Sequence, residues 1–169
     1  MKFGETVTID TMLIIPAIID VYYMRLALLM AQKAYDAGEV PVGAILVNHE
    51  RCIVGVGCNR VERCYSQTAH AEVCALVAAT TFLKDWRIVN GTMYVTLQPC
   101  GMCMHLMILS RITTVVYGAP SPVFGYHLDN DLFIQLYKNN IVMNVRNGSC
   151  SNEASLMLRS FFKKVRSKK

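Results

Sequence analysis

The sequence predicts an α/β fold in which a mixed five-stranded sheet lies between two layers of helices, a three-layer α/β/α sandwich. Two observations lead to this prediction. Short β-branched runs alternate along the chain with segments whose apolar residues recur every three or four positions, which indicates strands and amphipathic helices in turn. Strands that alternate with helices form one sheet covered on both faces. The 169 residues also suffice for one domain with a substantial core.

The first half of the chain is expected to supply two helices and three strands. Asp20 can cap a helix that runs to about Ala37, where Gly38 ends it. Two short β-branched runs separated by a polar turn then predict a hairpin. The hairpin strands, the second helix and the third strand are expected at residues 42–47, 53–57, 70–83 and 93–97.

In the second half, Pro99 ends the third strand and a helix follows it. A segment at 119–127 contains glycine and proline without periodicity, which predicts a loop. The remaining elements are helices at residues 101–110, 132–138 and 152–164 and strands at 112–117 and 141–145.

The chain is expected to form one domain over residues 20–169, ending in a basic helix, after an N-terminal extension of residues 1–19. The apolar run at 12–19 is too short to span a bilayer, and Pro16 interrupts it. The extension is either packed or mobile, or it precedes a true start at Met12 or Met24. No export signal or membrane span is recognisable, so we expect a cytoplasmic location.

Charge and cysteine content narrow the class of protein. With 53% hydrophobic and 17% charged residues, the composition excludes a disordered chain. The net charge of +5 suggests a polyanionic partner, and five basic residues lie within 163–169. That run is either a solvated tail or a set of contacts to nucleic-acid phosphates. Seven cysteines with only one closely spaced pair indicate a reducing compartment and a metal site, rather than a disulfide framework.

The closely spaced pair is Cys100 and Cys103, at the start of a predicted helix. By itself a Cys-x-x-Cys pair is a redox dithiol, half of a structural zinc site, or two buried cysteines. A c-type haem is excluded because Met104 follows the second cysteine. No second Cys-x-x-Cys pair completes a four-ligand structural site. Three protein ligands and an open position make a catalytic zinc site instead, and His70 is the best third ligand.

Glu72 lies two residues after His70, at the start of the second predicted helix. In a first helical turn that faces a metal, the imidazole can bind the ion while the carboxylate reaches a water and the substrate. Zinc lowers the pKa of bound water toward about 7, and a carboxylate can move the released proton. Elsewhere in the chain, His105 and His127 are expected to be core or surface residues. The combination of His-x-Glu with a downstream Pro-Cys-x-x-Cys therefore predicts a hydrolytic deaminase.

Five segments resemble the bacterial tRNA-specific adenosine deaminases. They are residues 39–44 (EVPVGA), 57–59 (GCN), 68–72 (TAHAE) and 94–103 (YVTLQPCGMC), and Phe161-Phe162 with the basic tail. The resemblance runs from about Asp20 to the end of the chain. It implies a cytidine deaminase-like fold and a hydrolytic reaction that converts the wobble adenosine of a tRNA anticodon to inosine and ammonia.

The resemblance also implies the roles of individual residues. His70, Cys100 and Cys103 would hold one Zn²⁺ per chain, with no organic cofactor, and Glu72 would be the catalytic proton carrier. Substrate binding would fall to three further residues: Asn59, the side chain of Val42 and the backbone of Ala71. The family works as a homodimer on a tRNA anticodon stem-loop. Its C-terminal helix contacts the RNA backbone, here through the basic side chains of Lys163, Lys164 and Arg166.

Several positions depart from the family pattern. Gln98 stands where the family usually has Glu, and we expect it to tune rather than abolish activity. Pro120-Ser121 replaces a basic residue followed by Asp in a loop that touches the RNA, and residues 125–127 and Met104-His105 are also unusual. These changes leave the chemistry intact and bear on which RNA is bound.

Two alternatives remain open from the sequence. One is a deaminase of a free base or nucleoside of the guanine or cytosine type, which the altered 120–127 loop allows. The other is a non-catalytic RNA-binding subunit that keeps zinc only for folding. The presence of Glu72 weighs against the second alternative, because such a subunit has no use for a proton carrier.

Overall fold

A mixed five-stranded sheet forms the centre of the computed structural model, which describes residues 11–126 and 143–167. The strand order is β2-β1-β3-β4-β5. Strand β1 (Gly43–Val47) pairs antiparallel with both of its neighbours, β2 (Ile53–Cys58) and β3 (Thr92–Leu97). The pairs β3–β4 and β4–β5 are parallel, with β4 at Thr114–Ala119 and β5 at Asn144–Asn147.

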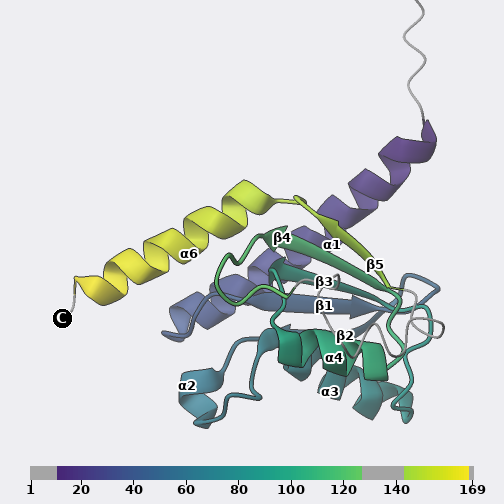
Figure 1. Ribbon diagram of the computed structural model, residues 1–169, viewed down its shortest axis with the longest axis horizontal. Helices are drawn as coiled ribbons and strands as arrows, with labels where there is room; N and C mark the ends of the chain where they lie inside the picture. The colour runs from purple at the N-terminus through teal and green to yellow at the C-terminus, as the bar shows by residue number, and fades with distance from the viewer. Residues whose placement is uncertain (1–10, 127–142, 168–169) are drawn as a thin grey trace, which may run out of the picture.

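Helices cover both faces of this sheet, as Figure 1 shows. On one face α1 packs against β1 and β3, and α6 against β4; on the other face α3 packs against β2 and β1 and contacts α4. The predicted three-layer α/β/α sandwich with a mixed five-stranded sheet is therefore confirmed. The helices within the described residues are α1 (Thr11–Asp36), α2 (Val61–Cys64), α3 (Ala71–Leu83), α4 (Gly101–Leu109) and α6 (Ser151–Arg166).

Most predicted elements are present with slightly shifted ends. The short helix α2 was not expected. The fifth strand is described at Asn144–Asn147, which overlaps the end of the predicted strand at 141–145, and residues 141 and 142 lie outside the described residues. The predicted helix at 132–138 falls outside the described residues. Within the described ranges, no helix combines the length and the apolar character needed to cross a membrane.

The start of the first helix is the clearest correction. The helix begins at Thr11, and Asp20 lies inside it, buried at 6% exposure. Its carboxylate accepts hydrogen bonds from Arg146 Nε and Nη2, at 2.9 and 2.8 Å, and from the Tyr94 hydroxyl at 3.1 Å. The prediction that Asp20 caps the helix is wrong because its partners come from β3 and β5. The division between an extension at 1–19 and a domain from 20 stays a prediction.

Close packing of α3 on the sheet fixes where that helix begins. A Cβ atom at Gly57 would collide with the backbone carbonyl of Ala71 and lie 2.6 Å from the backbone nitrogen of Ala75. Glycine at this position in β2 therefore allows the first turn of α3 to lie directly on the strand. Since His70 and Glu72 belong to that turn, the position of both side chains depends on this contact.

Candidate active site

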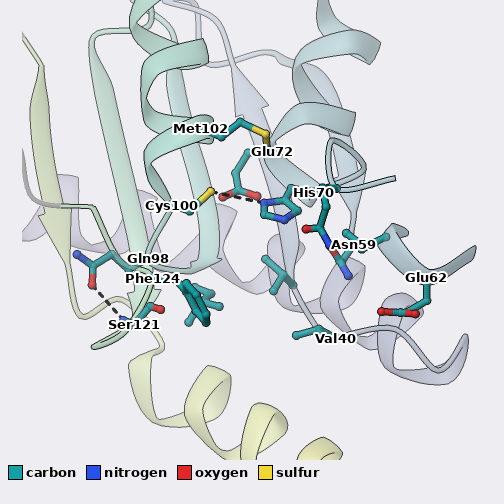
Figure 2. A pocket seen from close by; sticks show the side chains of 14 residues that line it. Val40, Asn59, Glu62, His70, Glu72, Gln98, Cys100, Met102, Ser121 and Phe124 are labelled. Atoms are coloured by element: carbon teal, nitrogen blue, oxygen red, sulfur yellow. Dashed lines mark hydrogen bonds between the residues drawn. The ribbon is translucent and has the colours of Figure 1, made fainter. Parts of the chain in front are cut away.

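Two helix N-termini bring the predicted zinc ligands together. His70 occupies the N-cap position of α3, and Cys100 occupies the N-cap position of α4, where β3 has just ended. Both residues have extended backbone conformations, so each side chain projects from the end of its helix. Figure 2 shows His70 and Cys100 pointing toward each other, with Glu72 beside them.

The three proposed ligands form one compact cluster. His70 Nδ1 lies 3.7 Å from Cys100 Sγ and 3.5 Å from Cys103 Sγ, and the three ligand atoms lie within 4.8 Å of one another. One imidazole and two thiols are a typical donor set for zinc. The residues therefore fit the ion that the sequence predicts, and a three-ligand set leaves a coordination position for a reacting group.

The electrostatics of the cluster suit a cation. A hydrogen bond from Cys103, with a second from His70, lowers the pKa of the Cys100 thiol to about 4. The same contact with Cys100, together with burial, raises the pKa of Cys103. The lowered pKa favours the thiolate form of Cys100, which is the form that binds metal.

Glu72 is the buried carboxyl group of the site. It is 4% exposed, and burial raises the pKa of its carboxyl above the ordinary value. It reaches the same cavity as His70 and Cys100, whose volume is about 470 Å³. This volume lies in the range of small-molecule sites. The cavity is lined by Val40, Val42, Asn59, Val61, Glu62, Gln67, His70, Glu72, Leu97, Gln98, Cys100, Met102, Ser121 and Phe124.

Two of the three predicted substrate-binding residues line the cavity, and the third does not. Asn59 and Val42 are buried and line the cavity. The Ala71 side chain is fully buried in the core under α3 and does not line it, so the role of its backbone stays a prediction.

The predicted RNA-contacting residues lie away from the cavity. Lys163, Lys164 and Arg166 are exposed in the last turn of α6, whose C-terminal end extends beyond the sheet (Figure 1). Lys164 Nζ also lies 5.2 Å from the centre of the Tyr35 ring. Their role in RNA binding stays a prediction.

A buried carboxylate behind Asn59 is a feature of the site that was not predicted from the sequence. Glu39 is 1% exposed and accepts hydrogen bonds from Asn59 Nδ2 at 3.2 Å and from the backbone N–H groups of Glu62 and Arg63 at 3.2 and 2.7 Å. It therefore holds the cavity asparagine and the start of α2 together. In the sequence, Glu39 is the first residue of the 39–44 segment that resembles the tRNA-specific adenosine deaminases, and no role was predicted for it.

The fold and the site define a zinc-dependent deaminase class, and comparison with known proteins agrees. Residues 18–119 match the model of the cytidine and deoxycytidylate deaminase zinc-binding region. The chain is 43% identical to the tRNA-specific adenosine deaminase of Buchnera aphidicola subsp. Schizaphis graminum, over 87% of this chain and 96% of that protein. It is 40% identical to the Haemophilus influenzae protein of the same name, over 86% and 84%.

A solved structure supports the same assignment. It comes from a study of A-to-I editing by tRNA deaminases at the wobble position of transfer RNA, and it superimposes with a TM-score of 0.74. The two chains are 31% identical, and the match covers 81% of this chain and 99% of the other. The chain belongs to the zinc-dependent cytidine and deoxycytidylate deaminase family, where it groups with the tRNA-specific adenosine deaminases. The resemblance noted in the sequence is confirmed.

Proposed function

We propose that this chain deaminates the wobble adenosine in the anticodon loop of a tRNA, giving inosine and ammonia. The observation that carries the proposal is the cluster of His70, Cys100 and Cys103 at the wall of a cavity that also contains buried Glu72. The names of the relatives support adenosine in tRNA as the substrate.

In this proposal His70, Cys100 and Cys103 hold one zinc ion. When bound, the zinc supplies an activated water as the nucleophile. Glu72 takes a proton from the attacking water and delivers protons to the ring nitrogen and to the departing amino group, so that ammonia leaves. The burial that raises the pKa of Glu72 suits this exchange, because a carboxyl that both accepts and donates protons works best with a pKa near the operating pH.

Substrate binding follows from the rest of the cavity wall. Val40, Val42 and Leu97 offer apolar surface for a flat base, and Asn59 offers a side-chain amide. A base reaches such a pocket only when it leaves its stack, which costs little in a single-stranded loop. Outside the pocket, the exposed basic side chains of Lys163, Lys164 and Arg166 supply phosphate contacts.

We further propose a cytoplasmic location and a homodimer. All seven cysteines are free, which suits a reducing compartment. Large apolar side chains are exposed at the C-terminal end of α3 and in the segment that follows it, including Phe82, Trp86 and Val89. Exposed side chains of this kind suit a subunit contact. Light scattering on the zinc-loaded protein should give twice the mass of the chain, and the mass of a single chain would contradict the dimer.

The test of the activity is a direct comparison of substrates. The zinc-loaded protein is incubated with an anticodon stem-loop RNA carrying adenosine at the wobble position, and with guanine and cytidine as free compounds. We expect inosine in the digested RNA and one ammonia per inosine, and no inosine from a matched stem-loop with guanosine at the wobble position. Turnover of guanine or cytidine without inosine in RNA would favour the free-base alternative. RNA binding without any turnover would favour the non-catalytic one.

A further inference from the structure

The loop that follows β4, residues 120–126, forms one side of the cavity and is anchored by Gln98. This side chain is 8% exposed. Its Oε1 accepts a hydrogen bond from the backbone N–H of Ser121 at 3.0 Å, and its Nε2 donates to the backbone carbonyl of Tyr126 at 3.2 Å. The two bonds tie together the two ends of the loop. Gly125 packs so closely on the Gln98 amide that a Cβ atom there would collide with Oε1.

An amide is the side chain that this anchor requires. The position must accept from the N–H of Ser121 and donate to the carbonyl of Tyr126. A carboxylate presents two acceptors, so one of its oxygens would face the Tyr126 carbonyl. The amide of Gln98, with one donor and one acceptor in use, is therefore matched to the conformation of this loop.

Tyr126 supplies a second anchor on α4. Its ring packs edge-on against His105, with ring centres 5.2 Å apart, and its hydroxyl lies 3.5 Å from His105 Nε2. His105 Nδ1 in turn lies 2.8 Å from the carbonyl oxygen of Gly101, one residue after Cys100. Gln98, His105 and Tyr126 thus form one connected cluster that holds the loop against the active site.

The loop presents an aromatic ring to the cavity. Phe124 is 76% exposed and lines the same cavity as Glu72 and Asn59. In Figure 2 it lies on the side of Gln98 and Ser121, across from Asn59. Its neighbour Val123 is 81% exposed and is not among the cavity-lining residues. The flat face of Phe124 is therefore available at the mouth of the pocket.

We propose that Phe124 stacks on the nucleobase adjacent to the deaminated adenosine, and that Gln98, His105 and Tyr126 position the loop for this contact. The proposal rests on the proposed function, which supplies RNA as the substrate. Unstacked bases of single-stranded loops bind to aromatic side chains through their faces, and phenylalanine adds no hydrogen bond. Phe124 therefore contributes affinity and register without selecting one base.

The first test separates binding from chemistry. Steady-state deamination of the anticodon stem-loop is measured for the zinc-loaded wild type and for F124A, F124Y and V123A. We expect F124A to raise KM about tenfold, as loss of one base–aromatic stack does, with kcat unchanged. F124Y keeps the ring and should restore KM, and V123A is the control on the same loop. An equal KM for F124A and V123A would overturn the proposal.

The second test varies the RNA. Two stem-loops carry an abasic nucleotide, one on the 5′ side and one on the 3′ side of the wobble adenosine. One of them should abolish the difference in KM between wild type and F124A, because the stacking partner is gone. A difference that persists with both RNAs would overturn the proposal. Absence of inosine with wild-type protein and intact RNA would instead contradict the proposed function.

The third test concerns the anchor. Q98E removes the donor to the Tyr126 carbonyl and should raise KM without lowering zinc content. Because Gln98 acts through Phe124, the double variant Q98E/F124A should show no higher KM than F124A alone. Additive effects, or an unchanged KM in Q98E, would show that Gln98 does not position Phe124.

Discussion

Glu39 offers the sharpest test of how the cavity is held together. Its buried carboxylate accepts three hydrogen bonds, from Asn59 Nδ2 and from two backbone N–H groups of α2. The substitution E39Q keeps the size of the side chain and replaces one oxygen by an NH₂ group. That NH₂ group would face an N–H donor. At least one hydrogen bond is therefore lost, and two donors are left facing each other.

The size of the effect follows from these contacts. A hydrogen bond to a charged group contributes about 1.5–3 kcal/mol. Because α2 is partly exposed, we take a value near the lower end, about 2 kcal/mol of unfolding free energy. For a chain of this length that corresponds to a fall in Tm of about 4–8 °C. Misalignment of Asn59 should also raise KM for the anticodon stem-loop about tenfold, the equivalent of about one hydrogen bond.

The assays are thermal unfolding, steady-state kinetics and zinc content of the purified variant. Zinc content should stay at the wild-type level, because Glu39 contacts none of the three proposed ligands. The control is E50Q, which makes the same exchange at an exposed position in the β1–β2 turn. A Tm and KM for E39Q equal to those of E50Q would refute the reasoning.

Three further predictions concern the metal site, the ion pair between α1 and β5, and the packing of α3 on β2. Cys100→Ala should lose both zinc and activity, and metal analysis that shows full zinc occupancy would count against its role as a ligand. Asp20→Ala leaves the guanidinium of Arg146 without its carboxylate partner. In a denaturant titration it should lower the unfolding free energy by about 2 kcal/mol, less than the loss of a fully buried pair would. An unchanged midpoint would show that the ion pair contributes nothing to stability. Gly57→Ala forces a methyl group into the backbone of Ala71 at the start of α3, and should cost about 1–3 kcal/mol and weaken zinc binding; wild-type zinc affinity would contradict that coupling.

Local sequence patterns were sufficient to predict most of the fold and the residues at the centre of the site. The alternation of strands and helices predicted the sheet and its two covering layers. The spacing of His70 and Glu72, and of Cys100 and Cys103, identified residues that the structure brings together at one site, because each pair lies within a single turn at the start of a helix. Such information is contained in a few consecutive residues.

Features that depend on distant partners were not predictable. Asp20 has the residue type of a helix cap, yet its hydrogen bonds come from residues 74 and 126 positions later in the chain. Glu39 reaches Asn59 across 20 positions, and α2 is too short to show a periodic pattern. The two partners of Gln98 lie 23 and 28 positions away. In each case the long-range contact, rather than the local sequence, decides what the residue does.

The central claim is that Glu72 carries protons in a zinc-dependent deamination of tRNA. It is tested most directly by the substitution E72Q, measured for zinc content, for circular dichroism and for inosine formation in the anticodon stem-loop. We predict wild-type zinc and wild-type secondary structure, with a rate lower by a factor of about 10² to 10⁴ or more, because general acid–base catalysis is removed. A zinc-loaded E72Q protein that forms inosine at the wild-type rate would contradict the account.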